Sequence, residues 1–388
     1  MLDAKRIAYL SQIHLRRVHL GQRGVGLEKR RLGRTNLSIS VVGFGGIPII
    51  EASRKAAVRT VRRAFKLGIN YFDTARAYGD SEEKIGEALH DVRGQVVLAT
   101  KTHQKTKEEA ARAGLKHSLR NLRTDSIDLV QLHGIDDVKT LESALTPDGS
   151  LAALKEARSS GTIDHIGITG HRPYVLAKAL RTNEFDTVLV PLNLITREAT
   201  EELMPLAKQL DIGVVTMKPF GGIDLNYSER DSRAPNPKAF DKIFGEQGPE
   251  KARRALRFVL AHDVATMVPG LRSPREVEHA AAVAERFREL TKREKEQYKF
   301  GQMPPEPFCR ECGLCVPCPE GINIPAVLRF EKYADFYGLR AYAKEQYQRL
   351  NTKADGCTQC GECVKKCPYR LDVVSMIKTT HETLAVDA

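Results

Sequence analysis

Eight strand-like runs alternate with eight helix-like runs between residues 41 and 287, and this alternation limits the fold more than any other feature. The strand-like runs are short and rich in β-branched residues, and the helix-like runs repeat apolar residues at helical spacing. The expected strands are residues 41–44, 70–73, 96–100, 127–132, 165–169, 187–194, 213–217 and 265–268. The expected helices are residues 54–67, 82–89, 107–122, 151–159, 174–181, 201–210, 249–261 and 274–287.

Nearly continuous hydrophobicity along the expected strands indicates parallel strands that are buried on both faces. Eight β–α units of this total length predict an α/β fold, a (β/α)8 TIM barrel. A doubly wound open sheet is the alternative, but it would place a Gly-rich dinucleotide fingerprint after its first strand. The sequence Gly43-Phe44-Gly45-Gly46 does not follow the G-x-G-x-x-G spacing, so the barrel is favoured.

The chain divides into three parts by composition. Residues 1–27 are expected to form a basic N-terminal extension, residues 28–300 the barrel, and residues 301–388 a C-terminal, mainly helical domain. A Pro-rich linker at 302–307 separates the barrel from the last part. The polar stretch 221–248 follows the seventh expected strand, where barrel active sites are built, so we expect it to be a functional loop.

The formal net charge is +12, from 61 basic and 49 acidic residues, and such an excess nominally fits nucleic-acid binding. The charge is uneven, however, because nine basic and two acidic residues fall within the first 34 positions. Residues 301–388 carry equal numbers of both signs, so no nucleic-acid partner is expected. The longest apolar runs, such as 188–192, are too short to cross a bilayer, and no membrane span is expected.

Four polar residues stand at or just beyond the carboxyl ends of consecutive expected strands: Asp73, Tyr78, Lys101 and His133. Because a barrel gathers these ends at one rim, we expect the four side chains to meet. A lysine makes a neighbouring phenol a usable proton donor, an aspartate keeps the lysine charged, and a neutral histidine can orient a substrate oxygen. Each residue alone is more often structural. Together they predict a site that protonates a carbonyl oxygen while hydride reaches the carbon.

Several longer motifs resemble the aldo-keto reductase family, from about residue 31 to residue 286. They are RRLGRTNLSISVVGFGG, YFDTARAYGDSEEKIGEAL, LATK, SIDLVQLHG, HIGITG, GVVTMKPFGG and VPGLRSPREVE. The resemblance implies that Tyr78 is the general acid/base, that Lys101 acidifies it, that Asp73 pairs with Lys101, and that His133 orients the carbonyl. It also implies a nicotinamide cofactor, NADP(H) or NAD(H), and a small-molecule aldehyde or ketone as substrate.

The same resemblance implies cofactor contacts at Thr169, Asn193, Met217, Gly270 and Arg272. Thr169 and Asn193 stand where the family presents polar groups to the nicotinamide amide, and Gly270 and Arg272 stand at the adenosine-phosphate corner. Arg272 is expected to pair with a 2′-phosphate, and a solvated arginine at a helix start is an equal alternative. Met217 departs from the usual aromatic residue, and its thioether is expected to cover the nicotinamide ring by dispersion.

All eight cysteines fall between positions 309 and 367, in two runs spaced C-x-x-C-x-x-C-x-x-C-P and C-x-x-C-x-x-C-x-x-x-C-P. A secreted disulfide protein would spread its cysteines along the chain, so this clustering indicates a cofactor. The second run matches the bacterial ferredoxin pattern, in which the fourth cysteine of each run ligates the other cluster. The expected ligand sets are Cys309, Cys312, Cys315 with Cys367, and Cys357, Cys360, Cys363 with Cys318.

These runs predict two [4Fe–4S] clusters, and a structural zinc site or a disulfide module is the alternative. Zinc sites with four cysteines use two separate C-x₂₋₄-C pairs, a pattern that two runs of four cysteines, each followed by proline, fit poorly. The clusters are expected to serve electron transfer, which would need a redox partner protein, or structure. Aldo-keto reductases with such a C-terminal domain form a subgroup that this chain resembles along nearly its whole length.

The sequence therefore predicts a cytoplasmic, NAD(P)H-dependent oxidoreductase of aldehydes or ketones that carries a ferredoxin-type domain. A second hypothesis couples the clusters to the nicotinamide through an external electron carrier. The alternative from a different class is a nicotinamide-sensing regulatory subunit, or an electron-transfer protein with little carbonyl turnover.

Overall fold

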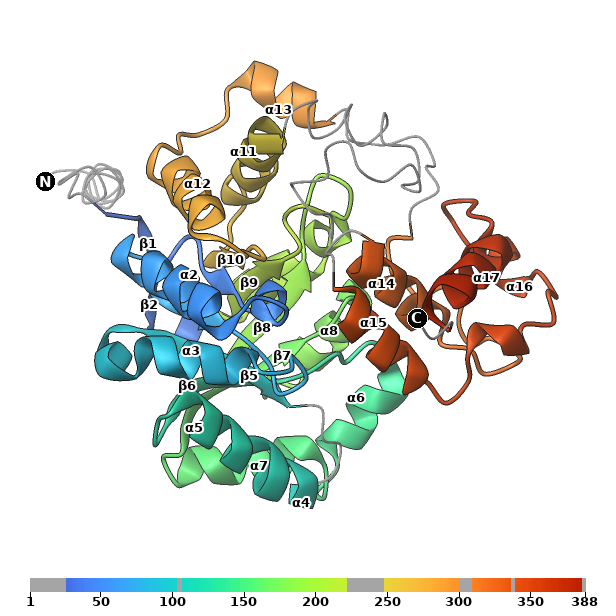
Figure 1. Cartoon of the computed structure of the whole chain (residues 1–388), viewed down its shortest axis with the longest axis horizontal. Helices are drawn as coiled ribbons and strands as arrows, with labels where there is room; N and C mark the ends of the chain where they lie inside the picture. The colour runs from blue at the N-terminus through green and yellow to red at the C-terminus, as the bar shows by residue number, and fades with distance from the viewer. Residues whose placement is uncertain (1–25, 103–106, 222–247, 300–308, 336–338, 386–388) are drawn as a thin grey trace, which may run out of the picture.

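The computed structural model describes residues 26–102, 107–221, 248–299, 309–335 and 339–385 (Figure 1). The expected linker at 302–307, nearly all of the expected N-terminal extension and all but the ends of the expected loop 221–248 lie outside these described residues.

Eight parallel strands form the centre of the molecule (Figure 1). In chain order they are β3 (Phe44–Gly45), β4 (Tyr71–Asp73), β5 (Val97–Thr102), β6 (Ile127–Leu132), β7 (Ile163–Thr169), β8 (Thr187–Pro191), β9 (Gly213–Met217) and β10 (Thr266–Val268). Each strand pairs with the next along the chain, and the bridges Val42–Met267 and Gly45–Gly270 join the first strand region to the last. The predicted (β/α)8 barrel is confirmed.

The first strand is shorter than the sequence predicts. Phe44 and Gly45 form the strand, whereas the expected strand covers residues 41–44. Close backbone approach explains the glycines in this region. A Cβ atom on Gly45 would lie 2.7 Å from the carbonyl oxygen of Pro269, and one on Gly43 would lie 2.9 Å from the Tyr71 ring. Residues without side chains therefore allow the first and last strands to meet and close the barrel.

Helices follow the strands around the outside of the barrel (Figure 1). They are α2 (Arg54–Lys66), α3 (Ser81–Leu89), α5 (Lys116–Leu122), α7 (Ser150–Ser159), α8 (Pro173–Leu180), α9 (Leu203–Gln209), α11 (Gly248–Leu260) and α12 (Pro274–Glu285). Serine caps begin two of them, since Ser53 and Ser273 accept backbone N–H groups from α2 and α12.

Three helical regions differ from the expected pattern. The expected helix 107–122 consists of α4 (Lys107–Glu109), a π-helical turn (Ala110–Leu115) and α5. The helices α6 (Val138–Leu145) and α13 (Lys292–Lys299) are not among those that the sequence predicts. Asp137 caps α6 through the N–H of Thr140 at 2.7 Å, which is the local signal that sequence reasoning overlooked.

A short hairpin covers the end of the barrel where the strands begin. Its strands are β1 (Lys29–Arg31) and β2 (Ser38–Ser40), and Leu32 between them is completely buried. Leu32 packs so closely on Gly213, the first residue of β9, that a Cβ atom there would lie 2.6 Å from the leucine side chain. Leu32 belongs to the inner core that the strand residues Tyr71, Leu129 and Val215 help to form.

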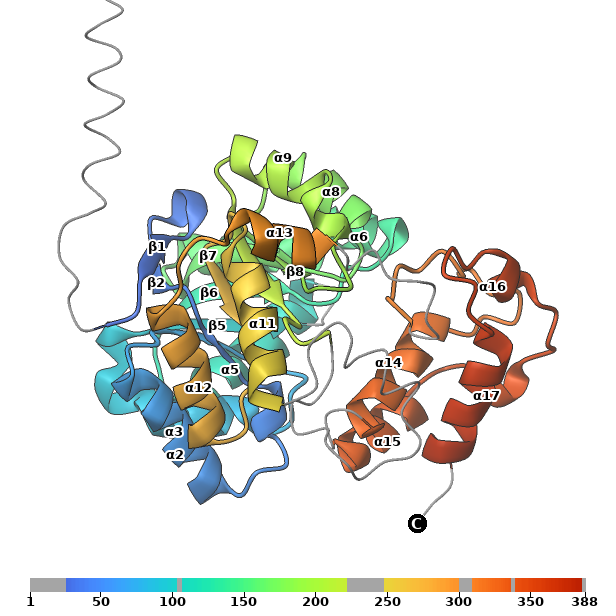
Figure 2. The same ribbon diagram turned by 90° about the horizontal axis from the view of Figure 1, so that it is seen from above.

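The C-terminal domain lies beside the barrel, with α14 and α15 nearest to it (Figures 1 and 2). Its helices are α14 (Ile324–Asp335), α15 (Arg340–Gln348), α16 (Glu362–Lys365) and α17 (Val373–Leu384), so the expected mainly helical domain is confirmed. Its small core surrounds Tyr347, whose hydroxyl lies 2.7 Å from His381 Nδ1 and accepts the N–H of Ala354 at 3.1 Å. Among the described residues, no helix combines the length and hydrophobicity needed to cross a bilayer.

Replacing Leu32 with alanine should lower the free energy of unfolding by about 2–5 kcal/mol, because it leaves a cavity at the closed end of the barrel. Denaturant unfolding followed by circular dichroism would measure the loss. Leu37→Ala in the same hairpin is the matched control and should cost less, because Leu37 is already half-exposed. Equal losses of unfolding free energy for the two variants would contradict the role of Leu32 in closing this end of the barrel.

Candidate active site

The structure brings Asp73, Tyr78, Lys101 and His133 together around one cavity of about 180 Å³. Asp73 is the last residue of β4, Lys101 lies near the end of β5, and His133 directly follows β6. Tyr78 lies in the turn between β4 and α3. Neighbouring parallel strands thus deliver residues that are far apart in the sequence to the same rim of the barrel.

Lys101 and Asp73 form a buried ion pair in the lining of the cavity. The Lys101 ammonium donates to Asp73 Oδ1 and, at 2.7 Å, to the backbone carbonyl of Thr74. The second oxygen of Asp73 accepts a hydrogen bond from Gln131 Nε2 at 3.0 Å. Burial lowers the pKa of Lys101 and raises that of Asp73, and the contact between the two groups opposes both shifts. The sequence predicted this pair but not its support by Gln131, since a glutamine within a strand carries no distinctive signal.

Tyr78 lies close to both Lys101 and His133. The Lys101 Nζ atom lies 5.0 Å from the centroid of the Tyr78 ring. The His133 ring meets the Tyr78 ring edge to face, with centroids 5.6 Å apart and planes at 81°. The phenol ring is therefore close to a buried cation and to an imidazole.

The turn that carries Tyr78 is fixed by hydrogen bonds to buried groups. Thr74 donates to the Ser81 hydroxyl at 2.9 Å, and that hydroxyl donates to the carbonyl of Gly46 at 2.8 Å. Glu82, which is fully buried, accepts hydrogen bonds from Thr100 of β5 at 2.7 Å and from Ser118 of α5 at 2.6 Å. The polar residues of the DTARAYGDSEEKIG motif thus bind the turn to the adjacent elements.

Of the five residues expected to contact the cofactor, Thr169, Met217 and Gly270 line the cavity, whereas Asn193 and Arg272 do not. Asn193 donates to the carbonyl of Lys218 at 3.0 Å and accepts the N–H groups of residues 195 and 196. Its amide therefore holds the chain after β9. Arg272 lies just before α12, where its own N–H donates to Glu276 at 2.7 Å.

The C-terminal domain also lines this cavity, which the sequence does not predict. The contributing residues are Arg329, Phe330 and Tyr333 from α14, and Tyr342 and Gln346 from α15. The catalytic candidates therefore face a wall that belongs to another domain. Helical periodicity alone cannot say which neighbour a helix face will meet.

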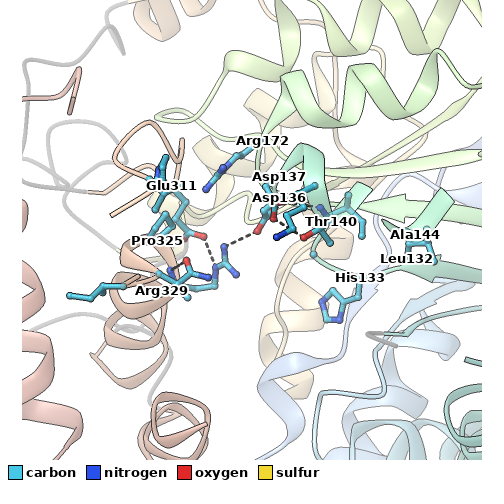
Figure 3. A pocket seen from close by; sticks show the side chains of 18 of the residues that line it. Leu132, His133, Asp136, Asp137, Thr140, Ala144, Arg172, Glu311, Pro325 and Arg329 are labelled. Carbon is cyan, nitrogen blue, oxygen red and sulfur yellow. Dashed lines mark hydrogen bonds and ion pairs between the residues drawn. The ribbon is translucent and has the colours of Figure 1, made fainter. Parts of the chain in front are cut away.

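Glu311 is a buried carboxylate at the junction of the two domains (Figure 3). It accepts hydrogen bonds from Lys218 of the barrel at 3.0 Å, and from Lys332 and Arg329 of α14 at 3.0 and 2.6 Å. Arg329 continues to Asp136, after β6, at 3.2 Å. Asp136 in turn accepts the backbone N–H of His171 at 2.6 Å.

The charges in this cluster depend on one another. Burial raises the pKa of Glu311, but Lys218, Lys332 and Arg329 outweigh it and hold that pKa well below its usual range. Burial lowers the pKa of Lys218 to about 8, although Glu311 opposes the shift. Glu311 lies within the first cysteine run and Lys218 directly follows β9, so the cluster joins the cysteine loop to the strand that ends at Met217.

A larger cavity of about 750 Å³ lies beside this cluster, between the two domains (Figure 3). Barrel residues from His133 to Thr140 form one side, and the loop around Cys318 forms the other. His133, Gly134 and Arg329 line both this cavity and the smaller one that holds the catalytic candidates. The junction between domains thus borders the candidate active site directly.

Four of the eight cysteines line one small cavity. Cys318, Cys357, Cys360 and Cys363 line one cavity, which joins the fourth cysteine of the first run to three of the second. Burial, together with the neighbouring Cys309 and Cys312 thiols, raises the pKa of Cys315 to about 12. Among the described residues, no group of three metal-binding side chains closes around a single ion. A thiolate-lined space with hydrophobic walls suits a cluster held by cysteines.

The first cysteine run also touches the barrel. Gly313 lies against Arg172 so closely that a Cβ atom would come within 2.2 Å of the guanidinium group, and its φ of +77° favours glycine. The Arg310 guanidinium lies 4.1 Å from the centroid of the Tyr369 ring, and Tyr369 donates to Glu198 of the barrel at 2.8 Å. The loop that carries the first three cysteines is therefore packed on the barrel face.

Comparison with known proteins decides the family. The model of the aldo/keto reductase family matches residues 41–299. The chain belongs to the aldo/keto reductase family. In this aldo-keto reductase, residues 308–372 match a second model, the 4Fe-4S dicluster domain. The C-terminal part is therefore an iron–sulfur domain, as its cysteine spacing predicts.

Curated relatives and solved structures agree with this assignment. This aldo-keto reductase is 32% identical over 206 residues to the uncharacterized oxidoreductase YqkF of Bacillus subtilis, over 50% of this chain and 65% of that protein, less than two thirds of its length. It is 30% identical over 287 residues to L-galactose dehydrogenase of Arabidopsis thaliana, over 67% of this chain and 89% of the relative. It superposes on the aldo-keto reductase AKR11C1 of Bacillus halodurans with a TM-score of 0.59 and 28% identity, over 71% of this chain and 96% of that structure.

Replacing Glu311 with glutamine should lower the free energy of unfolding by about 3–5 kcal/mol, because it leaves buried cations without their shared carboxylate. Denaturant unfolding of the anaerobically purified protein would measure this loss. Adding Lys218→Met should recover part of it by removing one of those cations.

Glu345→Gln provides the control for this prediction. Glu345 is an exposed glutamate of the same domain and pairs with Arg349. Its substitution should leave unfolding unchanged, because exposed ion pairs contribute little. If Glu311→Gln were as stable as the unsubstituted protein, the junction would not depend on the Glu311 carboxylate.

Proposed function

We propose that this protein reduces an aldehyde or ketone by hydride transfer from NADPH or NADH, with Tyr78 as the proton donor. The observation that carries the proposal is the meeting of Tyr78, Lys101 and His133 at one cavity, with Lys101 buried on Asp73. Membership of the aldo/keto reductase family supports it. When bound, the nicotinamide cofactor supplies the hydride.

The protein's own residues then supply the proton for the carbonyl oxygen. Lys101 keeps a positive charge near the Tyr78 phenol and stabilises the phenolate that remains after the proton is donated. Asp73 and the Thr74 carbonyl hold Lys101 in place, so this stabilisation needs no rearrangement during the reaction. His133 lines the same cavity and is proposed to orient the substrate oxygen toward Tyr78.

We propose Thr169, Met217 and Gly270 as the residues that contact the nicotinamide end of the cofactor, because they line the cavity with Tyr78. Arg272 and Asn193 lie outside that lining. We propose that Arg272 meets the adenosine phosphate and that Asn193 acts by positioning the carbonyl of Lys218.

We propose Cys309, Cys312, Cys315 and Cys367 as the ligands of one cluster, and Cys357, Cys360, Cys363 and Cys318 as the ligands of the other. The cavity shared by Cys318 and the second run supports the second set. Hydride transfer moves two electrons together and needs no iron, so a structural role suffices for the reduction. We place the protein in the reducing cytoplasm, since exposed clusters do not suit an oxidising compartment.

Tyr78→Phe should lower kcat for carbonyl reduction by about 10²–10⁴-fold, because it removes the proton donor. The measurement is NADPH oxidation against a panel of aldehydes and ketones. Cofactor binding, measured by calorimetry, should be unchanged in the same variant. Full activity of Tyr78→Phe would refute the assigned mechanism, and cofactor binding without turnover of any carbonyl by the unsubstituted protein would favour a nicotinamide-sensing role.

Iron and sulfide analysis of anaerobically purified protein should find about eight of each per chain. Cys363→Ser should lower both values by about half while the other cluster remains. Electron paramagnetic resonance after reduction would show which signal disappears. Stoichiometric zinc in place of iron would overturn the cluster assignment.

A further inference from the structure

The wall that faces the catalytic residues is built by the iron–sulfur domain. Phe330 and Tyr333 lie one helical turn apart on α14, and Tyr342 lies on α15. All three line the cavity that contains Tyr78 and His133. The barrel contributes the reacting groups, whereas the neighbouring domain contributes the surface opposite to them.

The three aromatic side chains form one continuous surface. The rings of Phe330 and Tyr333 have centroids 6.3 Å apart at an interplanar angle of 47°, and those of Tyr333 and Tyr342 are 5.9 Å apart at 45°. Tilted aromatic pairs at these distances stabilise one another. Each ring is half-buried, so the surface keeps an exposed part that a ligand can cover.

This aromatic wall, defined as Phe330, Tyr333 and Tyr342, is attached to the barrel beside Tyr78. The Tyr342 hydroxyl donates to the backbone carbonyl of Ala77 at 3.2 Å. Arg329, adjacent to Phe330, is held by Glu311 and by Asp136 of the barrel. Contacts from both α14 and α15 therefore hold the wall in a fixed position relative to the turn that carries Tyr78.

We propose that the aromatic wall recognises the body of the substrate and selects carbonyl compounds with a flat, apolar group such as an aromatic ring. This inference rests on the proposed function, because it names the substrate class of the same site. The cavity of about 180 Å³ favours a small compound. A ring stacked on Phe330 or Tyr333 would leave its carbonyl group on the side of Tyr78 and His133.

The test compares benzaldehyde with propanal as substrates of the holoenzyme. Phe330→Ala should lower kcat/KM for benzaldehyde about tenfold, mainly through KM, and should lower the value for propanal much less. Phe330→Leu should restore most of the benzaldehyde activity, because it returns apolar area to the wall. Iron content and thermal unfolding of each variant show whether the domain remains intact.

Tyr342→Phe and Tyr369→Phe form a matched pair, since each loses one hydroxyl that bonds the barrel. Tyr342→Phe should lower the preference for benzaldehyde over propanal, and Tyr369→Phe, which lies outside the cavity, should not. An equal loss for both substrates in Phe330→Ala, or no loss at all, would overturn the proposal.

A binding measurement separates this inference from the proposed reaction. Benzamide is an unreactive probe with the same flat shape, and calorimetry with NADP⁺ present measures its affinity without any turnover. In one outcome the protein reduces neither aldehyde and still binds benzamide, with Phe330→Ala weakening that binding about tenfold. That result would support recognition by the aromatic wall and refute the proposed reductase activity. If benzamide does not bind, or binds both proteins equally, the wall is not a recognition surface.

Discussion

The arrangement of the two domains depends on the buried carboxylate of Glu311. Lys218 of the barrel and Lys332 and Arg329 of α14 all donate to it. Removing these charges from water costs free energy that their hydrogen bonds roughly offset, so the net contribution of the cluster to stability is small. The larger consequence is geometric, because a carboxylate shared by both domains leaves few relative positions in which every buried charge is compensated. Glu311 lies between two cysteines of the first run, so folding of that loop and docking of the domain are linked.

Contact between the barrel and the C-terminal domain forms one cavity that both domains line. The barrel alone would present Tyr78 and His133 at an open rim, whereas α14 and α15 cover that rim with aromatic side chains. Desolvation of the site strengthens the effect of the Lys101 charge on the phenol. This arrangement gives the iron–sulfur domain a role that requires no electron flow to the nicotinamide. In the proposed function, hydride transfer would proceed on the barrel residues while the clusters keep α14 and α15 in place.

Much of the fold and half of the site follow from patterns within the sequence. The period of the apolar residues predicts eight strands and most of the helices, and the strand ends predict Asp73, Lys101 and His133 at one rim. The differences between the expected and the observed elements have local causes. The first strand is shorter because Gly43 and Gly45 meet neighbouring backbone, and α6 was missed because the Asp137 cap that begins it was overlooked. The positions of Asn193 and Arg272 outside the cavity could not be predicted, since loop paths depend on contacts with distant segments.

The sequence by itself determined the barrel, the four catalytic candidates at its rim and the presence of an iron–sulfur domain. These features rest on periodicity and fixed spacing, which are local properties of the chain. The tertiary structure decided that the two domains share one cavity, that Glu311 joins them, and that Phe330, Tyr333 and Tyr342 face Tyr78. Those contacts join residues more than ninety positions apart, such as Lys218 and Glu311, and depend on which buried charges and surfaces complement one another in three dimensions. No pattern within either domain specifies that match.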